Sequence, residues 1–129
     1  MTPELTVLVY VALLQVLQFC AYSVAANMQI GPKVALGPRD SKIELQGTAG
    51  RLQRALTNHY EGLILFTIAC VVLAVSGQST PFTQACAWVY LAARIAYVPA
   101  YVIDIGPWRS LIWLAGLTAT ILMLIKALP

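Results

Sequence analysis

Four long apolar stretches, separated by shorter polar ones, follow one another along the chain. The first, from Leu5 to Met28, would form a helix about 36 Å long at 1.5 Å per residue. The hydrocarbon core of a bilayer is about 30 Å thick, so a helix of this length can cross it. We therefore predict membrane-spanning helices at residues 5–28, 50–76, 82–103 and 108–128.

The connections between these helices differ in length. Residues 29–48 contain two Gly-Pro pairs together with charged side chains, which predicts a loop outside the membrane. The segments 77–81 and 104–107 are short and rich in Gly and Pro, so each predicts a tight turn between antiparallel helices. The pattern as a whole predicts an all-α fold, an integral membrane four-helix bundle that forms a single domain over residues 1–129.

The composition is typical of a protein surrounded by lipid. Hydrophobic residues make up 60% of the 129 residues and charged residues 10%, with a mean hydropathy of +0.78, so polar side chains cannot cover a water-facing globule. The net charge of +3 is small and scattered, which argues against a nucleic-acid partner. The three cysteines lie inside apolar stretches without neighbouring histidines, so we expect them to be buried and expect no metal site.

The distribution of basic residues predicts the orientation in the membrane. They gather around the first loop, whereas the second loop carries no charge; the basic residues are Lys33, Arg39, Lys42, Arg51 and Arg54. By the positive-inside rule, the first and third loops should be cytoplasmic and both termini should lie on the opposite side.

Polar residues interrupt the second predicted helix on one side only. Ionisable side chains within a span cost about 2.5 to 3.5 kcal/mol each on insertion scales, so each calls for a partner or a function. Four polar side chains are three, four and three residues apart and fall within an arc of about 80°. They are Arg51, Arg54, Asn58 and Glu61. His59 points about 100° away from this stripe, so we expect it to be an interfacial or subunit-contact residue without a catalytic part.

The third predicted helix carries a second stripe. Its members fall within an arc of about 60°; they are Tyr90, Arg94, Tyr97 and Tyr101. Because the turn between the two helices is short, the two stripes can face each other. We predict that Glu61 and Arg94 then form an ion pair, so that neither charge is left unpaired in the membrane.

Two interpretations of these stripes remain open. The polar groups could serve only to hold the helices together through hydrogen bonds. Alternatively, they could form a binding site, because an excess of positive charge remains at the cytoplasmic end after Glu61 and Arg94 neutralise each other. This excess comes from Arg51, Arg54 and Arg109. Such a site suits an anionic ligand that accepts several hydrogen bonds.

Three segments resemble the family of membrane-associated proteins in eicosanoid and glutathione metabolism, abbreviated MAPEG. Residues 51–61, RLQRALTNHYE, are similar to the family's R-x-x-R-A-x-x-N-x-x-E signature. Residues 89–97, VYLAARIAY, resemble its third helix, and residues 106–110, GPWRS, resemble the start of its fourth. Together with the four-helix layout, the resemblance covers nearly the whole chain.

The resemblance implies a homotrimer that binds glutathione, as co-substrate, in a cytoplasm-facing cleft between neighbouring subunits. The glutathione-binding residues that it implies are Arg51, Arg54, Asn58, Glu61, Arg94, Tyr97 and Tyr101, with Arg94 bracing Glu61. Arg109 would be the catalytic residue, since it matches the arginine that stabilises the glutathione thiolate in enzymes of the family. A guanidinium favours the charged form of a neighbouring thiol and lowers its pKa, which makes a better nucleophile.

The details resemble the bacterial branch of the family. Gly62 follows Glu61 where enzymes acting on leukotriene precursors have a tyrosine, and the loops are short. We therefore expect a multi-pass protein of a bacterial inner membrane with periplasmic termini. The expected function is a glutathione-dependent transferase or peroxidase that acts on a lipophilic small molecule arriving from the membrane lipid. The alternative is a non-catalytic membrane protein of the same fold that acts as a lipid-binding or assembly module.

Overall fold

The computed structural model describes the whole chain except residues 32–44 and residue 104. The described residues form four long α-helices: α1 (Pro3–Ile30), α3 (Gly47–Ser76), α4 (Pro81–Val102) and α5 (Pro107–Lys126). Each is long and apolar enough to cross a membrane. The predicted all-α membrane fold of four helices is therefore confirmed. The basic residues of the first loop, on which the predicted orientation depends, lie largely outside the described residues.

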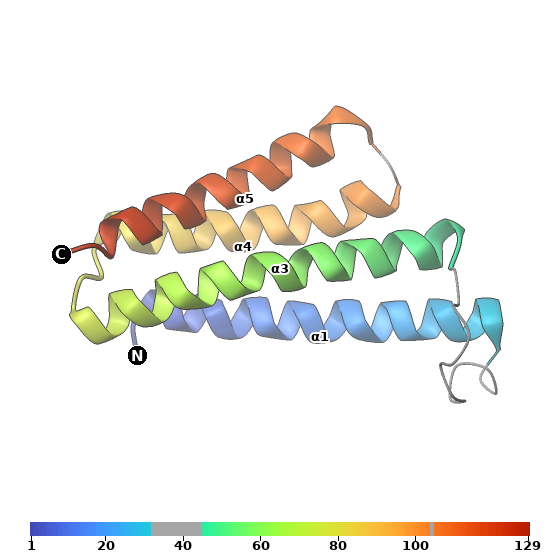
Figure 1. Cartoon of the computed structure of the whole chain (residues 1–129), viewed down its shortest axis with the longest axis horizontal. Coiled ribbons are helices and arrows are strands. Elements are labelled where there is room, and N and C mark those ends of the chain that lie inside the picture. Colours follow the sequence, from blue (N-terminus) through green and yellow to red (C-terminus); the bar gives the residue numbers. More distant parts are fainter. Residues whose placement is uncertain (32–44, 104) are drawn as a thin grey trace.

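The helices lie side by side in the order α1, α3, α4, α5 (Figure 1). Among the described residues every pair of helices makes contact except α1 and α5. Both chain termini and the α3–α4 turn lie at one end of the bundle, which we call the terminal end (Figure 1). Ile30, Gly47, Val102 and Pro107 lie at the opposite end, which we call the loop end. From the terminal end towards the loop end, α5 diverges from α4 (Figure 1).

The α3–α4 turn is set by local sequence. Gly77 adopts φ 68°, which ends α3, and its N–H donates to the carbonyl of Leu73. The Thr80 hydroxyl accepts a hydrogen bond from the N–H of Thr83, and the Thr83 hydroxyl accepts one from the N–H of Thr80. Pro81 follows in the first turn of α4, where its missing N–H does no harm. These features hold α3 and α4 antiparallel.

The apolar core lies in the half of the bundle nearest the terminal end. All four helices contribute to it, and the rings of Phe66 on α3 and Tyr90 on α4 stack with their centroids 4.0 Å apart at an interplanar angle of 7°. The other buried members are Val7, Val11, Ala69, Cys70, Leu73, Cys86, Ala87, Leu91, Ala119 and Met123. The terminal half of the bundle is therefore a packed apolar unit.

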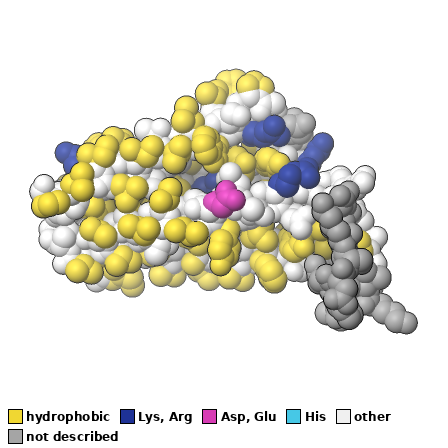
Figure 2. Space-filling model, viewed as in Figure 1, with side chains coloured by type: hydrophobic (Ala, Val, Ile, Leu, Met, Phe, Trp, Pro, Cys, Tyr) yellow, Lys and Arg dark blue, Asp and Glu magenta, His cyan; other side chains and the backbone are white. Residues whose placement is uncertain are grey.

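The outer surface is largely apolar as well, and Figure 2 shows hydrophobic side chains over most of the visible face. A continuous apolar surface of this extent suits contact with lipid, as the hydropathy predicts. Cys70 and Cys86 are buried, as expected. The same expectation is wrong for Cys20, which is exposed because it lies on the face of α1 that points away from the other helices.

Candidate functional site

Side chains from three helices meet at Tyr101 near the loop end. Arg54 of α3 donates a hydrogen bond from Nε to the Tyr101 hydroxyl at 3.0 Å. The Cζ atoms of Arg54 and of Arg109, on α5, lie 6.0 and 5.1 Å from the centroid of the Tyr101 ring. Contacts between a guanidinium and an aromatic face are favourable, so one tyrosine holds two cations close together. We call these three residues the arginine cluster.

A second set of contacts lies deeper in the bundle, next to the arginine cluster. Arg94 of α4 is 3% exposed, and its Nη1 donates to Oδ1 of Asn58, on α3, at 2.8 Å. Its Cζ lies 4.7 Å from the centroid of the Tyr97 ring, and that ring lies 5.7 Å from the ring of Tyr101. We call Asn58, Arg94 and Tyr97 the inner polar set. It links α3 to α4, and its Tyr97 ring packs next to the ring of Tyr101.

Arg51 has a local partner at the end of α4. Its Nη1 donates to the carbonyl of Val102 at 3.0 Å. The last carbonyls of a helix have no partner within the helix, so this bond satisfies one of them. Arg51 therefore ties the start of α3 to the end of α4, close to Tyr101 in the sequence of α4.

Glu61 lies apart from the other predicted site residues. Its side chain is exposed and lines a groove of about 480 Å³ between α1 and α3, together with Gln15 and Tyr60. The predicted ion pair between Glu61 and Arg94 is not formed, because Arg94 bonds Asn58 on the side of α3 that faces α4. Within one chain, contacts thus link six of the predicted site residues, whereas Glu61 lies apart and Arg51 bonds the end of α4; the six are Arg54, Asn58, Arg94, Tyr97, Tyr101 and Arg109.

His59 is the clearest departure from the sequence-based expectation. It is completely buried between α1 and α3, and Nε2 of Gln18 donates to its Nδ1 at 2.7 Å. The expectation that His59 is an interfacial or subunit-contact residue is therefore wrong for the single chain. A signal was present in the sequence, since a glutamine within an apolar span requires a polar partner and His59 is the only histidine.

The arginine cluster is accessible from outside the bundle. Arg54 is exposed, whereas Tyr101 and Arg109 are half-buried. Figure 2 shows most of the visible Lys and Arg side chains towards the loop end, another at the terminal end, and a largely hydrophobic surface between them. Guanidinium groups with several N–H donors can bind carboxylates in pairs of hydrogen bonds and can stabilise a thiolate. The site is chemically suited to an acidic ligand that carries a thiol.

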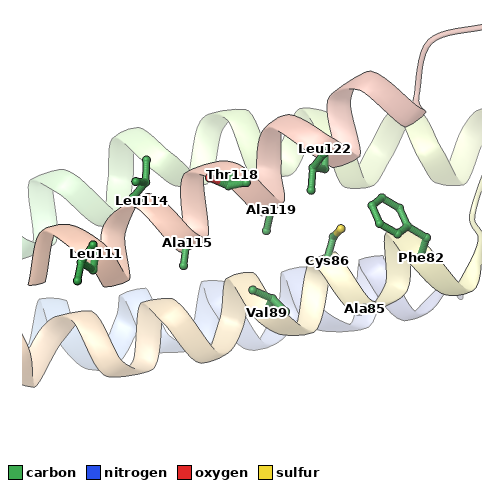
Figure 3. Close-up of a pocket in the computed structure, with 10 residues that line it drawn as sticks. All are labelled: Phe82, Ala85, Cys86, Val89, Leu111, Leu114, Ala115, Thr118, Ala119 and Leu122. Atoms are coloured by element: carbon green, nitrogen blue, oxygen red, sulfur yellow. The ribbon is translucent and has the colours of Figure 1, made fainter. Parts of the chain in front are cut away.

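An apolar groove of about 570 Å³ runs between α4 and α5 (Figure 3). Ten side chains line it, among them Leu111 towards the loop end and Phe82 and Leu122 towards the terminal end. Leu111 comes two residues after Arg109, or about 3 Å along the helix axis. The groove therefore begins close to the level of the arginine cluster and continues along the apolar part of the bundle.

The fold and the site define a multi-pass integral membrane protein of four helices that gathers cations and tyrosines at one end of the bundle. The chain belongs to the MAPEG family, because the family model matches residues 7–129. Members of this family are membrane proteins of the glutathione-related transferase and peroxidase type. The family predicted from the three sequence segments is thus confirmed. Comparison with curated proteins and comparison with solved structures found no match.

Proposed function

We propose that this protein is a glutathione-dependent membrane transferase or peroxidase that uses the glutathione thiolate against a lipophilic electrophile. The observation that carries the proposal is the convergence of Arg54 and Arg109, from two helices, on the single ring of Tyr101. Membership of the MAPEG family supports the same class of reaction. Glutathione is the co-substrate in this proposal, and no other cofactor takes part.

The predicted binding residues have different roles in this proposal. Arg51 and Arg54 offer N–H donors to the carboxylates of glutathione, while the inner polar set holds the wall of the site in place. Glu61 is exposed in the α1–α3 groove, about two turns of α3 from Arg54, where a neighbouring copy of the chain could complete the site. This placement supports the proposed homotrimer with glutathione between subunits.

The proposed chemistry requires a cation beside the sulfur. Arg109 stabilises the thiolate, and the thiol proton passes to water. In conjugation the sulfur electron pair forms the new carbon–sulfur bond, and the leaving group departs with its bonding electrons. In the peroxidase reaction the sulfur attacks one oxygen of a hydroperoxide and forms a sulfenic acid, while the oxygen–oxygen bond breaks and the departing alkoxide takes a proton from water. A second glutathione thiol then displaces water from the sulfenic acid and gives glutathione disulfide. The α4–α5 groove offers an apolar path for the electrophile from the bilayer towards Arg109.

The proposed orientation places the loop end in the cytoplasm and both termini in the periplasm of a bacterial inner membrane. Arg51 and Arg54, with the basic residues of the first loop, support it through the positive-inside rule. Glutathione would then reach the arginine cluster from the cytoplasm.

Titration calorimetry of the detergent-purified protein with glutathione tests the binding step. We expect measurable heat that saturates at micromolar to millimolar glutathione. Absence of heat at millimolar glutathione would overturn the proposal.

Arg109→Ala tests the catalytic step. We expect this variant to keep the oligomeric state and to lose the thiolate absorbance and conjugation, by about a hundredfold or more in kcat/KM. Lys126→Ala removes the cation at the other end of α5 and is the matched control, with unchanged turnover expected. Equal turnover of Arg109→Ala and wild type would assign the thiolate to another residue.

A second candidate function is a non-catalytic lipid-binding module. The α4–α5 groove favours it, because its lining is largely apolar. At one end of the groove, Nζ of Lys126 lies 5.6 Å from the centroid of the Phe82 ring. Native mass spectrometry distinguishes the two functions. Retained lipid, together with no thiolate absorbance on addition of glutathione, would support the lipid-binding module.

A further inference from the structure

A small recess lies in the middle of the bundle, where α3, α4 and α5 meet. Its volume is about 30 Å³, and it is lined in part by Gly62, Tyr90, Arg94, Trp113 and Thr120. A recess of this size has room for one guest of about the size of a water molecule. The recess lies beside the inner polar set and is distinct from the exposed arginine cluster.

The recess is rich in hydrogen-bond donors. Arg94 uses Nη1 for Asn58, but its Nε and Nη2 are buried and have no partner among the described residues. The buried hydroxyl of Tyr90 also has none. The Thr120 hydroxyl is already committed, since it donates to the carbonyl of Gly116 at 3.0 Å. Because a guanidinium has no acceptor, the groups left over at this recess are almost entirely donors.

The recess also contains a buried charge. Arg94 is 3% exposed and forms no ion pair within the described part of the chain, and the exposed side chain of Glu61 lines the α1–α3 groove instead. On insertion scales, burying an unneutralised cation in a membrane-spanning helix costs on the order of a few kcal/mol. The Tyr97 ring, 4.7 Å away, offsets only part of this cost, because a cation–π contact is worth about 0.5 to 2 kcal/mol. A negative guest would neutralise the charge directly.

We propose that this recess binds one monovalent anion of about the size of chloride. The anion accepts hydrogen bonds from Nε and Nη2, which share one edge of the Arg94 guanidinium, and from the Tyr90 hydroxyl. Water fits less well, because it carries no charge and offers only two lone pairs to these donors. The bound anion joins Tyr90 and Arg94 of α4 and, through Asn58, holds the inner polar set against α3. The inference does not depend on glutathione binding.

Gly62 keeps the recess open. A Cβ atom at this position would lie 3.1 Å from the Tyr90 hydroxyl oxygen, which is tighter than ordinary van der Waals contact. The hydroxyl would have to shift, and the guest would lose either its space or one of its donors. Gly62→Ala therefore changes the recess while it keeps every donor in the sequence.

Crystals of the full-length protein, grown without glutathione and soaked in sodium bromide, test the proposal directly. We expect an anomalous peak beside Arg94 and Tyr90. In solution, sodium bromide should raise the thermal unfolding midpoint saturably, whereas the same concentration of sodium isethionate, whose anion is too large for the recess, should not. Anomalous maps without a peak in the recess, together with equal unfolding midpoints in the two salts, would overturn the proposal.

Variants locate the effect. Tyr90→Phe keeps the ring stacked on Phe66 and removes one hydrogen bond to the anion, so the bromide affinity should fall about tenfold. Gly62→Ala should weaken bromide several-fold. Tyr10→Phe alters an exposed tyrosine of α1 and is the matched control, with unchanged affinity expected. Equal bromide responses of Tyr90→Phe and wild type would contradict the assignment. A protein that binds bromide in the recess but gives no heat with glutathione would support this inference and refute the proposed function alone.

Discussion

The terminal end and the loop end of the bundle are held together by different interactions. At the terminal end, apolar side chains from all four helices pack into one cluster around the stacked rings of Phe66 and Tyr90. At the loop end, the contacts are hydrogen bonds and guanidinium–ring contacts centred on Tyr101. Lipid is as apolar as the core, so close packing, with little help from water exclusion, stabilises the terminal end. The loop end, where Arg54, Tyr101 and Arg109 are accessible, can carry a binding site.

The course of α5 follows from this difference. Near the terminal end it packs against α4 through Ala119 and Met123, and towards the loop end it diverges from α4 (Figure 1). The α4–α5 groove extends along α5 as far as Leu111, two residues from Arg109. We therefore expect substitutions at the terminal end to change stability and substitutions at the loop end to change ligand binding.

The largest expected effect on stability is in the apolar core of the terminal end. Phe66→Ala should lower the free energy of unfolding by about 2 to 3 kcal/mol. This loss is below the usual range for a buried phenylalanine, because the unfolded chain also remains in lipid and only the packing and cavity terms are lost. The measurement is reversible unfolding in mixed detergent micelles. Phe19→Ala, which removes a ring that is 57% exposed on α1, is the control and should cost less than about 1 kcal/mol. Similar losses for the two variants would contradict a core confined to the terminal end.

The next largest expected effect on the free energy of unfolding comes from the Gln18–His59 hydrogen bond, which lies between the two ends of the bundle. Gln18→Leu leaves Nδ1 of the buried His59 without its donor, which should cost about 1 to 2 kcal/mol. A double-mutant cycle with His59→Phe should give a coupling energy of about 0.6 to 1.7 kcal/mol, the range of interhelical hydrogen bonds in membranes. Gln15→Leu, on the same helix, is the control, since its buried Oε1 has no partner among the described residues. A coupling energy near zero would show that the hydrogen bond does not hold α1 against α3.

The apolar pattern was sufficient to predict four spans, because length and hydropathy alone decide whether a helix can cross a bilayer. The spacing of three and four residues also identified Arg54 and Tyr101 as members of two polar stripes, since a helix has a known period, whereas Arg109 was identified from the family resemblance. Pairing between helices was harder to predict. The stripe pattern predicted Glu61 as the partner of Arg94, but Asn58 is the residue of α3 that Arg94 contacts, and this depends on the rotation of α3 about its axis. The same rotation buries His59 against Gln18.

Tyr101→Phe tests the loop end with a smaller change. It removes the hydroxyl that accepts from Nε of Arg54 and keeps the ring beside Arg109. Loss of one hydrogen bond of about 1 kcal/mol should weaken glutathione binding about fivefold, because Arg54 loses its orientation, while the unfolding free energy stays nearly constant. Titration calorimetry on the variant and on Tyr10→Phe gives the comparison. If Tyr101→Phe lowers stability and leaves the glutathione affinity unchanged, the arginine cluster is a structural contact only.

The smallest expected effect compares helix starts at the two ends. At the terminal end, the Thr80 hydroxyl caps α4 by accepting from the N–H of Thr83, so Thr80→Ala should lower the unfolding free energy by about 0.5 to 1 kcal/mol. At the loop end, the Gln46 side chain makes no capping bond to α3, and Gln46 contacts Gln29 only through its backbone N–H and carbonyl. Gln46→Ala keeps these backbone bonds and should have no measurable effect. An equal loss of unfolding free energy for the two variants would contradict this prediction. The side-chain cap at Thr80 would then stabilise its helix no more than the uncapped Gln46 does.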